Sequence, residues 1–169
     1  KKINIFTEKN CKKAILKFDN DNEQIFSIIR NRELYKLLIK KLKNNKHVKF
    51  INNLNFDKNK HEYKLIINCD PNHSITKKFF SKKFEKKYDS FAYTTIIEHK
   101  NLALNNTAIQ IFTKKGPMAF LPISNNKTSI VYSMRTKDNE QNLDIKKLIN
   151  KFNSNFKIKK LIKISKFKL

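Results

Sequence analysis

Residues 112–123 have the sequence Phe-Thr-Lys-Lys-Gly-Pro-Met-Ala-Phe-Leu-Pro-Ile, in which a Gly-Pro pair separates two runs of apolar residues. Gly116 is the single glycine of the 169-residue chain. A glycine next to a proline is typical of a tight turn, and the runs at 107–113 and 119–123 have the composition of β-strands. The stretch therefore predicts two strands joined by a turn at Gly116 and Pro117.

The second half of the chain continues this strand-rich pattern. Further strand-like runs cover residues 88–98 and 128–134, so we expect an antiparallel meander between 88 and 134. The apolar residues of 143–152 fall roughly on one helical face, which predicts a helix. Residues 157–169 alternate apolar and basic side chains and are typical of one last strand.

The first 42 residues predict three short strands followed by a helix. Apolar residues alternate with polar ones at 3–6, 14–18 and 25–29, and turn-forming residues separate these runs. The segment 31–42 then has a helical apolar stripe, and Asn31 is placed to cap the helix. The stripe consists of Leu34, Leu37, Leu38 and Leu42.

The segment between 47 and 80 returns to a strand-like composition. Residues 47–56 predict one or two short strands, and the apolar run 63–69 suits a buried strand. That run leads through Asp70 and Pro71 into a short helical stretch that ends at Phe80. The expected fold class is α+β, and a chain of this length can form one domain with a real core.

The formal net charge of +24 is the most extreme value of the composition. Such a charge suggests a polyanion partner, but nearly all of it is lysine, and arginine occurs only at 30, 32 and 135. Arginine is the preferred side chain for phosphate and base recognition. The lysines also spread along every segment, together with abundant Asn, Ile and Phe, which is the set that AT-rich codons encode. We therefore expect no specific nucleic-acid partner.

Several classes of site and location are disfavoured by the sequence. Cys11 and Cys69 lie far apart and the four histidines are scattered, so neither a disulfide framework nor a metal site is indicated. No run is long and apolar enough for a membrane-spanning helix, which predicts a cytoplasmic protein. The sequence starts with Lys rather than Met inside a strand-like run, so we expect an internal fragment of a longer protein.

Read for chemistry alone, the residues identify no catalytic group. The sequence contains no nucleophile with an adjacent base, no paired carboxylates and no phosphate-binding glycine loop. Three local patterns add information to this picture of an α+β domain.

The first pattern is residues 112–123, preceded by Asn106-Thr107-Ala108-Ile109-Gln110 and followed by the apolar run at 128–133. It resembles the substrate-domain stretch of the FAD-dependent hydroxylases of ubiquinone biosynthesis. In that family a strand ends in Phe, a Gly-Pro turn follows, and an apolar strand closes with Leu-Pro. The resemblance implies substrate-binding roles for five residues, namely Phe112, Gly116, Pro117, Leu121 and Pro122. Ordinary hairpin chemistry is the alternative explanation.

The second pattern is residues 66–77, which is similar to the family's strand, Asp-Gly and Ser motif with a final basic residue. There the backbone after the aspartate faces cofactor phosphates or ribose. The resemblance implies cofactor-binding roles for Asp70, Pro71, Ser74 and Lys77. Asn68 and Pro71 replace the two expected glycines, which puts nicotinamide contacts in doubt. The alternative is an Asp-Pro-Asn turn that caps a helix.

The third pattern is the strand-to-helix passage at 26–34, which resembles the family's passage into a leucine-rich helix. It implies that Asn31 and Arg32 lie near the flavin, whereas plain helix capping is the alternative for Asn31. The three patterns follow one another in the family's order. The family's opening Gly-x-Gly-x-x-Gly loop and its late Gly-Asp motif are both missing.

The resemblance implies an incomplete para-hydroxybenzoate hydroxylase-like fold. Residues 1–87 would be part of the FAD- and NAD(P)H-binding α/β region, and residues 88–169 would form the mixed, mainly antiparallel substrate-binding sheet with one helix. This interpretation requires the strand at 63–69 and the region 88–134 to build one body, a curved sheet that walls a cavity.

The implied reaction is hydroxylation of the aromatic ring of a ubiquinone precursor with FAD, NAD(P)H and O₂. The implied partners are a prenylated phenolic substrate, other enzymes of ubiquinone biosynthesis and, transiently, the surface of the inner membrane. An isolated fragment should have little or no activity. Two alternatives stay open: a non-enzymatic basic module that binds nucleic acid or anionic surfaces, and a stand-alone domain that binds a hydrophobic ligand.

Overall fold

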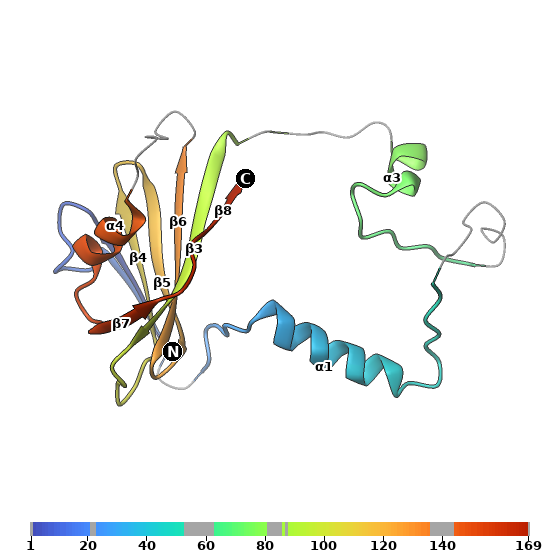
Figure 1. Ribbon diagram of the computed structural model, residues 1–169, viewed down its shortest axis with the longest axis horizontal. Coiled ribbons are helices and arrows are strands. Elements are labelled where there is room, and N and C mark those ends of the chain that lie inside the picture. The colour runs from blue at the N-terminus through green and yellow to red at the C-terminus, as the bar shows by residue number, and fades with distance from the viewer. Residues whose placement is uncertain are drawn as a thin grey trace. The chain divides into compact units, whose positions relative to one another are not determined.

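The computed structural model describes residues 2–20, 23–52, 63–80, 86, 88–135 and 144–168 (Figure 1). The chain divides into two compact units. Unit 1 consists of residues 1–30 and 87–169, and unit 2 consists of residues 31–86. The fold is a mixture of helices and strands with a mostly antiparallel sheet, which agrees with the predicted class at that level.

Unit 1 is built on an eight-stranded sheet in the order β2-β1-β4-β5-β6-β3-β7, in which β8 also pairs with β3. The pairing of β1 with β4 is parallel, and the other pairings of the described strands are antiparallel. The strands are β1 (Lys2–Thr7), β2 (Leu16–Asp19), β3 (Ser90–His99), β4 (Thr107–Thr113), β5 (Gly116–Ser124), β6 (Lys127–Arg135), β7 (Ile158–Leu161) and β8 (Ser165–Lys168).

Strict alternation along the central strands creates two different faces of the sheet. In β6, every second residue from Thr128 to Met134 is buried and the residues between them are partly exposed. Since successive side chains of a strand point to opposite faces, one face is covered and the other is accessible. The meander predicted between 88 and 134 is confirmed in the form of β3 to β6.

Helix α4 (Ile145–Phe152) covers one face of the sheet (Figure 1). Asp144 caps the helix, because its carboxylate accepts a hydrogen bond from the backbone N–H of Lys147 at 3.1 Å. Ile145, Ile149 and Phe152 are buried in one cluster with side chains of the sheet, among them Phe120, Ile130 and Tyr132. Burial of each such side chain contributes about 1.5–3 kcal/mol. The helix predicted at 143–152 is thus confirmed, although Leu143 lies outside the described residues.

Unit 2 contains two described helices, α1 (Asn31–Lys43) and α3 (Ser74–Phe79). Both were predicted. No described side chain of unit 2 is buried. Leu37 of the α1 stripe, for example, is 57% exposed. None of the helices in the described part of the chain has the length and apolar character needed to cross a lipid bilayer.

The strand predicted at 63–69 is wrong. These residues form no strand, and Leu65 and Ile67 are 76% and 77% exposed. A continuous apolar run becomes a buried strand only where neighbouring strands pair with it, and no strand of the described sheet does so. Residues 25–29 and 47–52 also form no strand. Residues 53–56, the end of the strand region predicted from 47, are not described.

The predicted domains, 1–87 and 88–169, and the two units of the structure share a boundary near residue 87 but differ in where residues 1–30 belong. Residues 1–30 belong with 87–169, because β1 pairs along its whole length with β4, from Lys2 opposite Thr107 to Thr7 opposite Phe112. Residues 63–69 and 88–134 therefore belong to different units, and the single body that the hydroxylase interpretation required is not observed. The last predicted strand consists of two short ones, β7 and β8, which pair with opposite ends of β3.

Candidate functional site

The predicted substrate residues gather on the β4–β5 hairpin of unit 1. Phe112 and Pro117 lie directly opposite each other in the two strands, and Thr113 pairs with Gly116 at the turn. Leu121 is on the same face as Pro117, since the two are separated by four positions of one strand. Pro122 is an exception. It is buried on the opposite face, level with Thr128, because neighbouring residues of a strand cannot face the same way.

The accessible face of the sheet has an apolar centre. We call the nine mid-strand positions of this face in β4, β5 and β6 the open face. Nearly a third of the residues of the chain are charged, but none of these nine is. Phe112 is 47% exposed and Pro117 is exposed too, whereas Ala108, at the other end of β4, is buried. The open face consists of Ala108, Gln110, Phe112, Pro117, Ala119, Leu121, Ser129, Val131 and Ser133.

Because glycine has no side chain, Gly116 lets the backbone of β5 lie closer to β6 than any other residue at this position would. Its φ of +146° lies in the region that side chains disfavour. A Cβ atom at this position would stand 2.0 Å from the carbonyl oxygen of Ser133. The glycine is therefore required by the packing of β5 against β6, which is a structural role at the place where the resemblance implies a substrate contact.

A cleft of about 560 Å³ lies at the end of the sheet where the β4–β5 turn, the end of β6 and the start of β3 meet. We call it the rim cleft. Its lining includes three cationic residues, Lys114, Lys115 and Arg135. The uncharged residues of the lining include Ser90, Gly116 and Pro117. Arg135 is opposite Ser90 in the pairing of β3 with β6. None of the described residues that line this cleft is an Asp or Glu.

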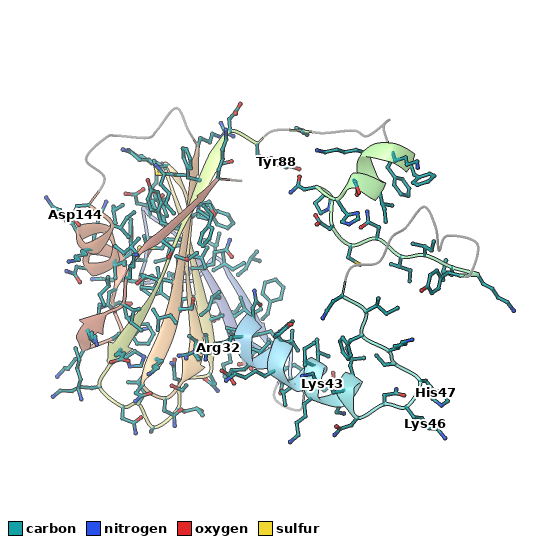
Figure 2. The ribbon with its side chains drawn as sticks, turned by 45° about the vertical axis from the view of Figure 1, so that its right-hand side comes forward. Arg32, Lys43, Lys46, His47, Tyr88 and Asp144 are labelled. Atoms are coloured by element: carbon teal, nitrogen blue, oxygen red, sulfur yellow. The ribbon has the colours of Figure 1, made fainter. Side chains whose placement is uncertain are left out.

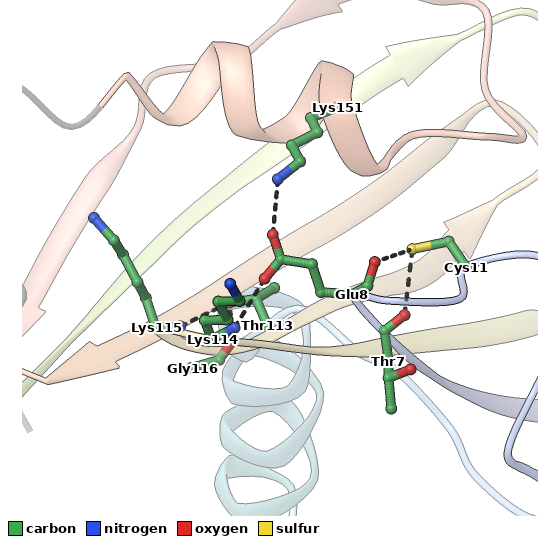
Figure 3. Close-up of polar contacts among 8 residues, drawn as sticks. All are labelled: Thr7, Glu8, Cys11, Thr113, Lys114, Lys115, Gly116 and Lys151. Carbon is green, nitrogen blue, oxygen red and sulfur yellow. Dashed lines mark hydrogen bonds and ion pairs between the residues drawn. The ribbon is translucent and has the colours of Figure 1, made fainter.

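Glu8 fixes the back of the β4–β5 turn (Figure 3). One carboxylate oxygen accepts a hydrogen bond from the Lys151 ammonium at 2.7 Å, and the other accepts one from the backbone N–H of Lys114 at 2.9 Å. These two bonds, the one from Lys151 above all, hold the pKa of Glu8 below its ordinary value of 4.5. Figure 3 shows the Lys115 side chain extending away from Glu8.

The predicted cofactor residue Asp70 lies in a turn that uses most of its polar atoms internally. Its side chain accepts a hydrogen bond from the backbone N–H of Asn72 at 2.9 Å, and its carbonyl oxygen accepts one from the Thr76 hydroxyl at 2.6 Å. Asn68, which replaces an expected glycine, also bonds within this turn. The Asp-Pro-Asn turn before a helix is therefore the observed structure.

The other predicted cofactor residues of this segment do not converge on one place. Asp70 and Pro71 line a hollow of about 300 Å³, but Ser74 and Lys77 do not. The cap of α3 is His73, whose Nδ1 accepts a hydrogen bond from the backbone N–H of Ile75, and Ser74 is the first helical residue. The segment thus offers no cradle for a phosphate among its described residues.

Asn31 and Arg32 stand at the start of α1, where both are exposed. Arg32 and Lys43 mark the two ends of the helix (Figure 2). Asn31 is the first helical residue rather than the residue before the helix, which differs from the predicted cap by one position. Neither residue lines the hollow beside Asp70.

A buried Thr–His pair resembles a catalytic dyad in composition, but its surroundings indicate a structural role. The Thr128 hydroxyl lies 3.0 Å from His99 Nε2, and His99 Nδ1 lies 2.9 Å from the carbonyl oxygen of Lys100. His99 is 2% exposed and Thr128 is 0% exposed, so no substrate reaches the hydroxyl. The pair satisfies polar groups inside the core. No cluster of metal ligands occurs in the part of the chain that the structure describes.

The sequence patterns identified Gly116 and Pro117 of the rim cleft but missed its cationic residues. Lys114 and Lys115 were counted as turn residues, and Arg135 was counted only as one of three arginines. A usable signal was present, since a single arginine at the end of a predicted strand stands out in a chain whose charge is otherwise lysine. The position of Ser90 opposite Arg135 depends on strand register, which the sequence does not specify.

Comparisons with known proteins give no family assignment. No family model matches the sequence, and no curated protein matches it. Among solved structures, the flavin-dependent halogenase CmlS is similar over 56% of this chain and 20% of its own length, with 14% identity and a TM-score of 0.40. This chain therefore spans about a fifth of the halogenase. A likeness at that level establishes neither the fold nor the activity of this chain.

Proposed function

We propose that unit 1 is the substrate-binding sheet of a flavin-dependent aromatic-ring monooxygenase, with a prenylated phenol of ubiquinone biosynthesis as the substrate. The observation that carries the proposal is the uncharged open face, which contains Phe112, Pro117 and Leu121. An antiparallel sheet that faces water on one side normally carries polar residues there. A face with six apolar residues and three uncharged polar ones therefore suits contact with an apolar ring or prenyl chain.

The order of the three sequence patterns supports the same proposal, although the structure does not support every residue role that the patterns implied. The pattern at 112–123 falls on the hairpin that presents the open face. The pattern at 66–77 falls on a turn that bonds within itself, so it supplies no support for a nucleotide site. The proposal therefore rests on unit 1 alone and no longer includes one body built from residues 63–69 and 88–134.

The described residues do not fit a resident flavin or NAD(P)H. Asp70 is engaged in its own turn, and α3 has only six residues, which is too short for a helix terminus that holds phosphate. In the proposed enzyme the flavin supplies the oxidation chemistry and is bound by other polypeptide. The contribution of this chain is to hold the ring against Phe112 and Leu121 and to exclude water from that side.

A binding measurement tests the role of the open face. We expect 2-prenylphenol to bind the chain in a saturable way in titration calorimetry, and Leu121→Glu to weaken that binding at least about 10-fold, since the charge is costly beside an apolar ligand. Leu104→Glu is the matched control, because Leu104 is 69% exposed in a loop outside the open face. Equal binding by both variants contradicts the proposal.

The enzymatic part of the proposal has its own test. The chain alone, supplied with FAD, should consume little or no NADH or NADPH. Turnover by the chain alone would show that it holds the cofactors itself. The coding sequence on either side decides the class, because a dinucleotide-binding loop upstream and a Gly-Asp motif downstream are the flanking elements of such a monooxygenase.

A stand-alone domain that binds a hydrophobic ligand is the second candidate. It is favoured by one specific observation, namely that the sheet and α4 form a unit with its own buried core, separate from residues 31–86. This candidate predicts that 2-prenylphenol binds with the same affinity in the presence and absence of FAD. Flanking sequence without the two motifs would support it against the monooxygenase.

A further inference from the structure

Another hollow of unit 1 lies on the face of the sheet that α4 covers. Its volume is about 310 Å³, and we call it the side pocket. Ile109 and Ile111 of β4 line it. Their side chains point away from the open face, because the two residues flank Gln110 in the strand and successive side chains alternate between faces. The side pocket is therefore a different place from the open face.

Four large apolar side chains line the side pocket, namely Phe6, Ile109, Ile111 and Phe152. Ile111 and Phe152 are members of the buried core of unit 1. Phe6 and Ile109 pack against that core but are themselves only partly buried. Apolar surface of the core thus borders the side pocket over β1 and β4.

The first wall of the side pocket is the turn after β1, which internal hydrogen bonds hold in place. Cys11 lines the pocket, and its thiol donates a hydrogen bond to the Thr7 carbonyl oxygen at 3.5 Å (Figure 3). The Asn10 side-chain oxygen accepts hydrogen bonds from the backbone N–H groups of Lys12 and Lys13, both at 3.1 Å. This wall therefore has a defined conformation.

The second wall is the end of α4 and the turn that follows it. Asn153 closes this turn, because its side chain donates to the Phe156 carbonyl oxygen at 2.7 Å and accepts from the Phe156 backbone N–H at 2.9 Å. Ser154 and Asn155, the two residues inside this turn, line the pocket. The second wall is thus fixed by its own hydrogen bonds as well.

Glu8 joins the two walls. It belongs to the turn after β1, and its carboxylate pairs at 2.7 Å with the ammonium of Lys151 in the last turn of α4. Binding sites for small molecules are usually largely formed before the ligand arrives. A pocket with two joined walls needs little further ordering on binding, which favours affinity.

The size and the lining of the side pocket define the ligand that it suits. A cavity of about 150 Å³ is enough for one benzene molecule, so the side pocket has room for two fused rings. Phe6 and Phe152 offer aromatic surfaces, which favour an aromatic ring over an aliphatic one. Lys12 is the one charged residue among those that line the pocket, and a charge on the ligand would be costly beside the isoleucines.

We propose that the side pocket binds an uncharged aromatic molecule of one or two rings, in contact with Phe6 and Phe152. This inference goes beyond the proposed function, because it adds a second ligand on the opposite face of the sheet. It requires neither the open face nor a flavin.

Indole is the probe for the first test, because the chain contains no tryptophan and the fluorescence of indole can be excited apart from that of the tyrosines. Indole should bind the full chain in a saturable way. Cyclohexanol, an uncharged aliphatic ring, should compete with indole at least about 10-fold less well. Absence of saturable binding, or equal binding of the two rings, would overturn the proposal.

The two cysteines provide a test on the unchanged protein. Cys11 lines the side pocket, whereas Cys69 is exposed in unit 2. At an indole concentration about ten times its dissociation constant, alkylation of Cys11 by iodoacetamide should slow about 10-fold, since mainly the free protein reacts. Alkylation of Cys69 should keep its rate, as measured by peptide mass spectrometry. Equal protection of both cysteines, or of neither, would overturn the proposal.

A matched pair of substitutions tests the pocket itself. Cys11→Leu places a larger side chain in the pocket and should weaken indole binding at least about 10-fold, whereas Cys69→Leu, the same change outside it, should have no effect. Equal affinities of the two variants would overturn the proposal.

The two faces of the sheet are separated by Leu121→Glu. This change on the open face should leave indole binding intact. Loss of indole binding as large as that in Cys11→Leu would assign the binding to the open face and overturn the proposal. Failure of 2-prenylphenol to bind, with these indole results intact, removes the proposed function alone.

Discussion

The two units of this chain are both rich in lysine and in large apolar residues, but among the described residues only those of unit 1 form a core. In unit 1, Ile97, Met118 and Ile149 are fully buried. In unit 2, the described leucines and isoleucines are all partly or largely exposed. The difference shows that apolar content does not produce burial unless segments distant in sequence pair with each other, as the strands of unit 1 do.

The two longer helices make the same comparison on a smaller scale. Helices α1 and α4 are both amphipathic, as their apolar spacing predicted. Helix α4 buries three side chains against the sheet, whereas α1 buries none. An apolar stripe therefore predicts that a helix forms, but the surface that covers the stripe must come from another element.

The largest expected difference between the units is in local stability. We expect the backbone amides of β5 and β6 to exchange with solvent on the order of 1000-fold more slowly than those of α1, because exchange in a core requires global unfolding that costs at least about 5 kcal/mol. Hydrogen exchange with mass spectrometry measures this directly. Equal protection of α1 and β6 would show that unit 2 is stabilised as strongly as the sheet.

Gly116→Ala should be the most damaging single substitution of the comparison. The new Cβ would meet the Ser133 carbonyl at 2.0 Å with a disfavoured φ. Overpacking and backbone strain each cost about 1–3 kcal/mol, so we expect a loss of about 4 kcal/mol in the free energy of unfolding. Urea denaturation followed by circular dichroism gives the value. Ser165→Ala in β8 is the control, and a loss below 1 kcal/mol for Gly116→Ala would mean that the hairpin shifts at little cost.

Two alanine substitutions, one in each amphipathic helix, should differ in their loss of stability by nearly as much as Gly116→Ala costs. Ile149→Ala in α4 removes a side chain that is 0% exposed and should cost about 3 kcal/mol, within the usual range for a buried isoleucine. Leu37→Ala in α1, at a position that is 57% exposed, should change stability by less than about 0.5 kcal/mol. Thermal unfolding of both variants checks the pair. A large effect at Leu37 would reveal a contact surface for α1.

The smallest expected effect concerns ion pairs, one in each unit. Glu8→Gln should lower stability at pH 7 by roughly 0.5 kcal/mol, because the paired carboxylate is only partly buried and its partner Lys151 is 56% exposed. A lowered pKa stabilises the fold above the unfolded value near 4.5, and this contribution is lost as the pH falls through the folded pKa. The two proteins should therefore converge in stability as the pH falls through the lowered pKa of Glu8.

Glu33→Gln in α1 is the comparison for that prediction. Glu33 pairs with Lys36 at 3.4 Å with more than half of both side chains exposed, so no measurable change is expected. A difference between wild type and Glu8→Gln that does not shrink as the pH is lowered from 7 to 3 would contradict the assigned role of the Glu8 carboxylate. Measuring the stability of the wild type and of both variants from pH 3 to pH 7 tests both predictions.

The sequence predicted the elements whose signals are local. The strands at 107–113 and 128–134 and the helices at 31–42 and 143–152 depend on alternation, helical spacing and turn residues that neighbours supply. It did not predict what depends on distant partners. The run at 63–69 has strand composition but lacks a pairing strand among the described residues. The parallel pairing of β1 with β4 produces no pattern in the local sequence.

The candidate site shows the same limit. Phe112, Pro117 and Leu121 lie on one face of the β4–β5 hairpin, and their role in substrate binding stays a prediction. Pro122 was placed with them although the two-residue period of a strand assigns it to the opposite face, which the sequence alone could have indicated. Arg135 and Ser90 meet through the register of β3 and β6, and register follows from the packed sheet.

The parallel pair of β1 and β4 also bears on the synthesis of the protein. Lys2 pairs with Thr107, which the ribosome makes 105 positions later. At about 5–20 residues per second, β1 waits roughly 5–20 s for that neighbour, while its hairpin with β2 covers only one edge. During translation, the unpaired edge of β1 is thus the place where a nascent chain of this protein is open to strand addition by another polypeptide or to capture by a chaperone.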